Sequence, residues 1–288
     1  MLTRILAPNP SALTGPGTNT FLLGQRHVAV IDPGPDIASH RAAILAASGG
    51  RISHIFVTHA HLDHSEGAAA LARETGAPIL AFGTATEGRS ARMTRLAAEG
   101  LAGGGEGLDL DFTPDLLLRD GDAVETPDWT LRAIHTPGHM GNHLSFALDD
   151  AVFCGDLVMG WSSTLVSPPD GDLSDYFRSL DRLHHHAPQR LIPAHGDAID
   201  AVAPRLNELA AHRRMRTAQI LSALRHQPGT AAELATRIYD VPPPLLPAAT
   251  RNVFAHLVAL QDIGAITTPG PGGPDDRFES IYIALSKY

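Results

Sequence analysis

Four side chains that can bind metal ions lie within six consecutive residues of the sequence. Residues 58–64 read Thr-His-Ala-His-Leu-Asp-His and follow directly after a short apolar run. His59 and His61 are two residues apart, so at the end of a strand their side chains point to the same face. Asp63 and His64 follow in the turn toward the next segment. Three imidazoles and a carboxylate at this spacing predict a metal site.

Three later segments each add one metal-binding side chain at a predicted strand end or turn. They are His139 in Thr-Pro-Gly-His, Asp156 in Cys-Gly-Asp and His195 in Pro-Ala-His-Gly. Imidazole and carboxylate ligands together suit zinc, or iron and manganese, better than calcium or magnesium. A pair of such ions can turn a shared water into hydroxide at neutral pH and can polarise a carbonyl or phosphoryl oxygen. The residues therefore predict hydrolysis of an ester, a thioester, a lactam or a phosphodiester, without choosing among these bonds.

Apolar runs and helical periodicity place these segments in two blocks of strands. In the first block we expect helices at residues 36–47 and 65–75 and strands at residues 20–23, 28–31, 54–57 and 78–81. A helix at residues 86–101 follows the first block. In the second block we expect strands at residues 116–118, 124–126, 130–135, 144–148, 152–154 and 191–193. A helix at residues 173–186 precedes the last of these strands. This order predicts an α/β fold in which two sheets are covered by helices on the outside, an αββα sandwich.

The composition changes near residue 201, where a long helix over residues 201–224 begins. The elements expected after it are helices at residues 230–239 and 248–263 and strands at 265–267 and 278–284. Three helices and a two-stranded wing predict a small winged helix. We therefore expect a catalytic domain at residues 1–203 and a linker helix with a winged-helix-like domain at residues 204–288.

The helix that would read DNA in such a domain carries only Arg251 and His256 as basic residues, so binding to duplex DNA is not expected. Three roles stay open for the domain: covering the mouth of the active site, positioning the substrate, or self-association into a homo-oligomer. A DNA-binding regulator with a metal-sensing domain is a competing hypothesis, which the complete set of metal-binding residues disfavours.

Charge and composition exclude several classes of protein. The 288 residues carry a formal net charge of −9, which argues against a surface coated with basic residues for nucleic acid. No apolar run approaches the roughly 18 residues of a membrane span, and no secretory signal is recognisable. Cys154 is the only cysteine, so no intramolecular disulfide forms, and we expect a cytoplasmic protein. In its apolar run, Cys154 is expected to be a small buried hydrophobic residue.

The pattern HxHxDH, followed by a distant His, an Asp and a final His, resembles the signature of the metallo-β-lactamase superfamily. The resemblance implies an αββα sandwich and two divalent metal ions, zinc first, with manganese or iron as alternatives. It implies that the first ion is held by His59, His61 and His139, the second by Asp63, His64 and His195, and that Asp156 bridges them. Asp63 would also orient the hydroxide and accept its proton, as a catalytic residue.

A closer resemblance is to the β-lactamase-like protein 2 group. It rests on Gly-Thr-Asn-Thr at residues 17–20, on Thr-Pro-Gly-His at 136–139 and on the helix around residues 212–221 before the winged helix. This resemblance implies an endoribonuclease, a phosphodiesterase that cleaves single-stranded RNA. The alternative is a glyoxalase II-like hydrolase that acts on a small-molecule thioester, lactone or ester at the same metal centre.

Some further residues allow two interpretations each. His143 follows His139 by four residues; it either acts catalytically on the leaving group or a substrate oxygen, or bonds to backbone at a strand start. Trp161 and Tyr176 either line a pocket or pack in the core. Arg89, Arg92 and Arg95 recur every three residues, so we expect them on one helix side, as a solvated face or as phosphate contacts. The histidines at residues 184–186 are expected at a solvated helix end.

Overall fold

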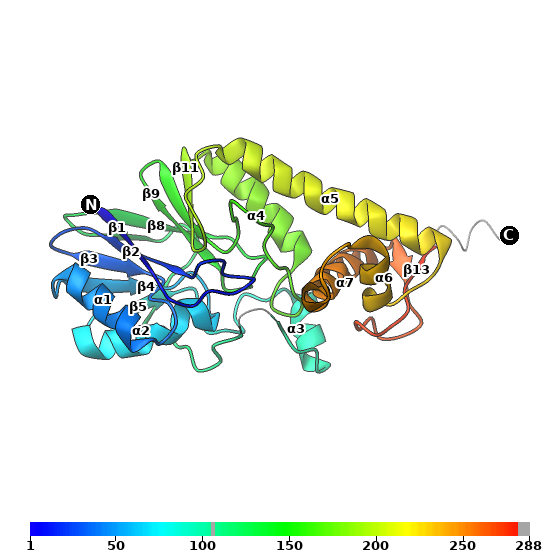
Figure 1. The fold of residues 1–288 in the computed structure, drawn as a ribbon, viewed down its shortest axis with the longest axis horizontal. Helices are drawn as coiled ribbons and strands as arrows, with labels where there is room; N and C mark the ends of the chain where they lie inside the picture. The colour runs from blue at the N-terminus through cyan, green and yellow to red at the C-terminus, as the bar shows by residue number, and fades with distance from the viewer. Residues whose placement is uncertain (105–106, 282–288) are drawn as a thin grey trace.

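Two β-sheets pack face to face and helices cover their outer faces in the computed structural model, which describes residues 1–104 and 107–281 (Figure 1). The first sheet contains six strands, in the order β1 (Leu2–Leu6), β2 (Asn19–Leu23), β3 (Val28–Ile31), β4 (Ile52–Phe56), β5 (Ile79–Ala81) and β6 (Leu116–Leu117). Strands β1 to β3 pair antiparallel, and β3 to β6 pair parallel. Helices α1 (Ala38–Ser48) and α2 (Leu62–Thr75) connect the parallel strands and pack on the outer face.

The second sheet contains five strands, in the order β11 (Arg190–Pro193), β10 (Ala151–Gly155), β9 (Leu144–Leu148), β8 (Thr130–His135) and β7 (Ala123–Glu125). Aromatic side chains fill the space between the two sheets. The rings of Phe56 on β4 and Phe146 on β9 lie 5.2 Å apart between centroids, and so do those of Phe21 on β2 and Phe153 on β10. These tilted pairs add to the burial of apolar area that joins the sheets. The predicted αββα layering is confirmed.

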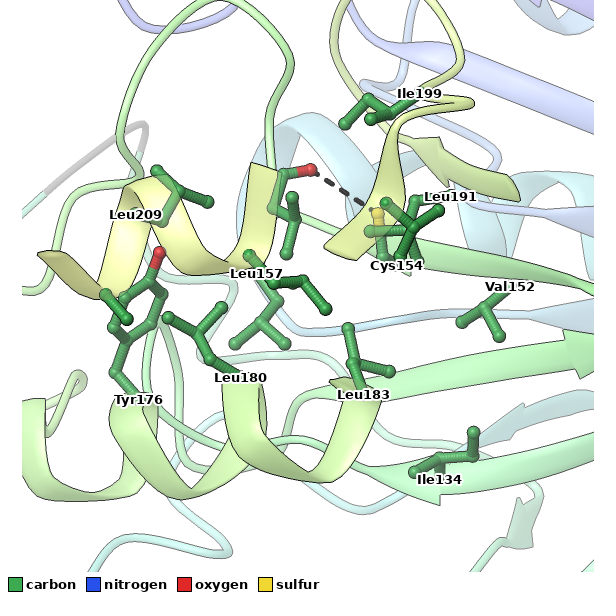
Figure 2. Packing of buried hydrophobic residues seen from close by; sticks show 14 of the residues in the cluster. Ile134, Val152, Cys154, Leu157, Tyr176, Leu180, Leu183, Leu191, Ile199 and Leu209 are labelled. Carbon is green, nitrogen blue, oxygen red and sulfur yellow. Dashed lines mark hydrogen bonds between the residues drawn. The ribbon is translucent and has the colours of Figure 1, made fainter. Parts of the chain in front are cut away.

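Helix α4 (Leu173–His186) covers the outer face of the second sheet. It begins where the side chain of Asp172 accepts hydrogen bonds from the backbone N–H groups of Ser174 and Asp175. Its buried side chains include Tyr176, Leu180 and Leu183, at the spacing of one helical face (Figure 2). Tyr176 therefore packs in the core and does not line a pocket.

Cys154 lies in the same cluster, opposite helix α4 (Figure 2). Its thiol lies 3.4 Å from the carbonyl oxygen of Val158, to which it donates a hydrogen bond. Burial raises the pKa of the Cys154 thiol far above its usual value. The side chain is therefore the small buried hydrophobic residue that the sequence predicted.

The C-terminal part forms the predicted winged helix. Helix α5 (Val202–His226) runs from the second sheet to this part of the molecule (Figure 1). The elements that follow are α6 (Ala231–Ile238), a short 3₁₀ helix η1 (Pro243–Leu245), α7 (Leu246–Asp262), β12 (Ile266–Thr267) and β13 (Glu279–Ser280). Thr230 and Glu233 form a capping box at the start of α6. Residues 282–284 of the strand predicted at 278–284 lie outside the described residues.

Helix α5 belongs to both parts of the chain. Its Leu206 and Leu209 pack in the core beside helix α4, whereas Ile220 and Leu224 pack in the C-terminal core. One continuous helix therefore crosses the boundary that we predicted between residues 203 and 204 and packs in both cores. No helix among the described residues is both long and apolar enough to span a membrane.

Most predicted bounds shift by one or two residues, whereas β1, α2 and α3 differ by more. Strand β1 was not predicted, because its side chains are almost all exposed and show no alternation of polar and apolar residues. Helix α2 begins at Leu62 instead of residue 65, so that Asp63 and His64 lie in its first turn. Helix α3 (Ala91–Ala98) is shorter than the predicted 86–101, because the Ser90 side chain caps its first turn.

Candidate metal centre

The seven predicted metal ligands meet at one edge of the sandwich. His59 and His61 follow strand β4, and Asp63 and His64 begin helix α2. His139 lies between β8 and β9, Asp156 follows β10 and His195 follows β11. Because β10 and β11 are parallel and β9 is antiparallel to β10, the ends of β10 and β11 lie beside the start of β9. The backbone N–H of Leu144 donates to the carbonyl of Thr58 over 2.8 Å, which joins this edge to the end of β4.

All seven side chains are buried, and their nitrogen and oxygen atoms converge. They form three groups whose possible ligand atoms lie within 4.8 Å of one another: His59 with His61 and His139; His59 with His64 and Asp156; and Asp63 with His64 and His195. The first group, with His139, and the third group, with His195, contain the same residues as the two ligand sets that the resemblance implied.

Asp156 lies between these two groups. One of its carboxyl oxygens, Oδ2, is 3.7 Å from the Nε2 atoms of both His64 and His139. The other, Oδ1, is 3.3 Å from Nε2 of His195. The position is compatible with the bridging role predicted for this residue.

The polar atoms of the cluster fit metal binding better than hydrogen bonding. Nε2 of His61 and Oδ1 of Asp63 are buried and have no hydrogen-bond partner among the described residues. Nδ1 of His61 lies only 3.1 Å from Nε2 of His59 and 3.0 Å from Nε2 of His139. Buried polar atoms without partners are costly, and a shared cation would satisfy them.

The pKa values of the predicted ligand histidines shift in two directions. Burial, followed by the neighbouring histidines, lowers the pKa of His59 well below its usual value and that of His61 to about 3. Burial also lowers the pKa of His139. These rings are neutral at pH 7, which is the form that binds metal ions.

His64 and His195 behave in the opposite way. Burial disfavours their charged forms, but nearby carboxylates outweigh it; Asp63 and Asp156 raise the pKa of His64, and Asp156 raises that of His195 to about 10. In the metal-free chain these two rings are therefore protonated and pair with the carboxylates. A bound cation would release the protons and take their place.

Asp32 supports His64, and the sequence analysis missed it. Its Oδ2 accepts hydrogen bonds from Nδ1 of His64 at 3.0 Å and from the hydroxyl of Thr58 at 2.8 Å. Its Oδ1 accepts one from the backbone N–H of Thr58 at 2.7 Å. These contacts turn the other nitrogen of His64, Nε2, toward the cluster. The available signal was its place directly after strand β3, where the other predicted ligands also follow strands.

Residues near the N-terminus also hold the predicted ligands in place. The hydroxyl of Thr18 donates to Oδ2 of Asp63 at 3.1 Å. The side-chain amide of Asn19 donates to the carbonyl oxygens of Pro193 and Gly196, on either side of His195, at 3.2 and 2.8 Å. This segment therefore orients the ligand loops as well as starting strand β2.

His143 is buried behind the cluster rather than in a cavity. Its Nδ1 lies 2.9 Å from the hydroxyl oxygen of Thr136, and its Nε2 accepts a hydrogen bond from the backbone N–H of Asp156 at 3.2 Å. Burial lowers the pKa of His143 well below its usual value, so Nε2 can act as an acceptor. Both nitrogens are engaged within the protein, which favours the second interpretation of this residue. In the structure Nε2 faces the backbone of Asp156 and neither nitrogen faces the cavity.

Two of the three arginines that were expected to share one helix side are used in protein contacts. Arg89 precedes helix α3, so the prediction of a common helix side is wrong for this residue. It forms an ion pair with the buried Asp170. Arg92 donates to the side chain of Gln261 on α7 at 2.7 Å. A phosphate-binding face is therefore not formed here, while the histidines at 184–186 are exposed at the end of α4, as expected.

A cavity of about 290 Å³ opens over the cluster. Five predicted ligands contribute to it, namely His61, Asp63, His139, Asp156 and His195. The rest of its wall comes from the N-terminal loop, from the loop 159–165 that contains Trp161, and from the C-terminal domain. Trp161 lines the cavity while remaining half exposed. Among the described residues, no lysine or arginine lines this cavity.

Comparison with known proteins gives two domain matches. Residues 13–195 match the family described as the metallo-beta-lactamase superfamily, and residues 230–268 match the beta-lactamase associated winged helix domain. A protein of Caenorhabditis elegans named beta-lactamase-like protein 2 homolog is 31% identical over 277 residues, which cover 93% of this chain and 86% of that protein.

Two further proteins are similar to the chain. The atrochrysone carboxyl ACP thioesterase of Aspergillus chevalieri is 32% identical over 228 residues, which cover 77% of this chain and 65% of that protein. The crystal structure of a metallo-beta-lactamase family protein from Thermus thermophilus superposes with a TM-score of 0.77 at 28% identity. That similarity covers 97% of this chain and 98% of the Thermus protein.

Proposed function

Because the chain belongs to the metallo-beta-lactamase superfamily, whose members are metal-dependent hydrolases, we propose that it hydrolyses an ester or a thioester at a pair of metal ions. The observation that carries the proposal is the convergence of seven buried His and Asp side chains in three overlapping groups beside an open cavity. Bound there, two divalent ions would lower the pKa of water and polarise the substrate carbonyl.

The ligand sets that we propose are the first and third groups described above. His59, His61 and His139 hold one ion, and Asp63, His64 and His195 hold the other. Asp156 contacts both groups, which supports a shared carboxylate. The mixture of imidazole and carboxylate favours zinc, with manganese or iron as alternatives. The unpaired Cys154 favours a reducing compartment, the cytoplasm.

Asp63 is the proposed proton acceptor. Its side chain borders the cavity, its Oδ2 is held by Thr18, and its Oδ1 has no hydrogen-bond partner among the described residues. Burial would raise the pKa of Asp63, but His64 and His195 outweigh burial and lower it far below its usual value. The carboxyl is therefore ionised, so Oδ1 can orient the attacking water; the proposed transfer of the proton to Asp63 would take place with the cations bound, when His64 and His195 are no longer protonated.

Cleavage of single-stranded RNA is the second candidate. It is favoured by the similarity to beta-lactamase-like protein 2 homologs over most of the chain. It is disfavoured by the cavity, where no described lysine or arginine faces a phosphate, and by the engagement of Arg89 and Arg92 elsewhere. Phosphate contacts dominate the affinity of proteins for nucleic acids, so an ester or thioester suits this cavity better.

The test compares wild type with Asp63→Ala, both loaded with zinc or manganese, on acyl thioesters, on an aryl ester and on mixed-sequence single-stranded RNA. We expect wild type to hydrolyse thioesters or esters and the variant to lose about 100-fold or more in kcat. Asp109→Asn is the matched control, because Asp109 bonds to Ser65 on α2 but does not line the cavity.

Metal content and thermal unfolding are measured for each protein. Cleavage of RNA alone, lost in Asp63→Ala, would replace the proposed substrate by the second candidate. Full turnover by a folded, metal-replete Asp63→Ala protein would overturn the proposed mechanism.

A further inference from the structure

One wall of the cavity over the predicted metal ligands is built by the C-terminal domain. Six of its residues, all from the end of α6 to the first half of α7, line the cavity: Tyr239, Val241, Leu245, Ala248, Ala249 and Asn252. Leu13 and Trp161 of the catalytic part lie on the same cavity. The wall is therefore mostly apolar, while the predicted metal ligands supply a polar floor.

The side-chain amide of Asn252, in this wall, already has hydrogen-bond partners within the protein. Oδ1 of Asn252 accepts hydrogen bonds from Arg213 at 2.8 Å and from the backbone N–H of Val166 at 3.3 Å. Its Nδ2 donates to the carbonyl oxygen of Ala248 at 3.2 Å. The ring of Tyr239 is covered by the guanidinium of Arg216, 4.2 Å from the ring centroid. What this wall offers a ligand is apolar surface.

Arg213 holds the wall against the catalytic part. Its side chain is fully buried on α5 and donates both to Asn252 on α7 and to the carbonyl oxygen of Thr164. The hydroxyl of Thr164 in turn lies 3.2 Å from Nδ1 of His139. The wall and the predicted metal ligands thus belong to one connected, buried unit, which is a preformed binding site rather than a loose contact between domains.

Helix α7 is the helix that would read DNA in a winged helix, and here its surface is used within the protein. It packs against α5 and α6 and contacts α4, and eight of its residues are buried. Its single arginine, Arg251, donates to the carbonyl oxygen of Ala102 at 3.1 Å and to the hydroxyl of Ser167 at 3.2 Å. The face that would enter a DNA groove is therefore turned toward the catalytic part.

We propose that this wall is the binding site for an uncharged, apolar acyl group of the substrate, and that the segment from Tyr239 to Asn252 selects its length. The inference rests on the proposed ester or thioester hydrolysis. No described lysine or arginine lines the cavity, and the apolar wall offers no cation to pair with a carboxylate on the acyl arm, so burying such a carboxylate there is costly. At about 290 Å³ the cavity is at the small end of ligand pockets, which suits a short acyl chain.

The test uses N-acetylcysteamine thioesters of acetyl, butanoyl, hexanoyl and succinyl groups with the metal-loaded protein. Butanoyl has two methylene groups more than acetyl, and hexanoyl has two more again. Each methylene buried in the cavity should raise kcat/KM roughly fourfold. The succinyl thioester, which carries a carboxylate, should be at least about tenfold poorer than the butanoyl one.

Ala248→Phe fills the cavity from a half-buried position on α7, and Ala232→Phe is the matched control at an exposed position on α6. We expect Ala248→Phe to abolish the gain in kcat/KM from acetyl to hexanoyl. Ala232→Phe should keep the gain. Thermal unfolding of each variant checks that it is folded.

A binding measurement separates the site from the reaction. The metal-free protein is titrated with 2-octanone, an uncharged and non-hydrolysable probe, and the fluorescence of Trp161 is followed in a Trp129→Phe background. Saturable binding that is lost in Ala248→Phe supports the site even if no thioester is cleaved, in which case only the proposed function fails. Thioester hydrolysis without any dependence on chain length, together with no binding of 2-octanone, would overturn the inference and leave the proposed function standing.

Discussion

Replacement of Asp32 by asparagine tests how the fold controls a predicted metal ligand. A neutral His64 can offer Nε2 to a metal only if its proton is on Nδ1, the atom that faces Asp32 at 3.0 Å. An asparagine has the same size but one carboxyl oxygen becomes an NH₂ group. If that group faces His64, two donors meet, and the ring must move its proton to Nε2. If it faces the backbone N–H of Thr58 instead, two donors meet there.

Either orientation therefore leaves one buried polar contact unsatisfied, because Asp32 is only 2% exposed. Such a contact costs about 1–3 kcal/mol. A loss of that size in metal binding corresponds to a weakening of roughly 10–100-fold, the usual effect of removing a partner that orients a metal ligand. We expect the loss mainly at the ion held by the group that contains His64.

The assay is a competition between the metal-free protein and a zinc chelator at pH 7, with thermal unfolding of the metal-free protein measured in parallel. Wild type is expected to bind two ions, and Asp32→Asn to bind one of them about 10–100-fold more weakly. Asp109→Asn is the matched control, since the Asp109 carboxyl accepts a bond from Ser65 at 2.8 Å and has no hydrogen bond to the side chain of a predicted ligand. Wild-type affinity for both zinc ions in Asp32→Asn, together with wild-type thermal unfolding of its metal-free form, would refute the argument.

Two further predictions concern buried groups of the C-terminal part. Arg213→Met removes the contact to Thr164 and, through it, the support of His139, so zinc affinity should fall about 10–100-fold. The control is Arg214→Met on the same helix α5, where the guanidinium stacks on Phe177 of α4; this variant should bind zinc like wild type. Equal affinities in the two variants would contradict the role of Arg213. Burial, and then Arg213, lower the pKa of His256 to about 3, below its value of about 6.5 in an unfolded chain. The unfolded state therefore binds the extra proton as the pH falls below 6.5, and this histidine should cost about 2 kcal/mol of stability between pH 6.5 and pH 5. Urea unfolding at pH 7, 6 and 5 should show a smaller loss for His256→Gln, and the same loss as in wild type would contradict the prediction.

The order of the elements could be predicted because each carries its own hydrophobic pattern. Strands at 130–135 and 144–148 and the helix at 173–186 match the structure to the residue, since buried side chains recur at the period of the element. Strand β1 could not be predicted in this way. Its side chains are exposed, and it is held by backbone bonds to β2, whose position depends on the rest of the sheet.

The candidate site was likewise predictable from the sequence only in part. The residues of the cluster at 59–64 are neighbours in the chain, and the types of the distant His139, Asp156 and His195 complete a recognisable pattern, so the sequence by itself determined the chemistry expected at this site. His143 shows the limit of that reasoning, because its side chain type suits both a catalytic and a structural role. Only the positions of Thr136 and the backbone of Asp156 decide between them.

Tertiary structure alone decided what surrounds the cluster. Asp32 meets His64 across 32 residues of chain, and Arg213 meets Thr164 across 49. The sequence left three roles open for the winged helix, and the structure places residues of this domain in the wall of the cavity. The physical reason is that hydrophobic periodicity and metal-binding motifs are encoded locally, whereas hydrogen bonds and cavities between distant segments depend on how the packed elements are brought together.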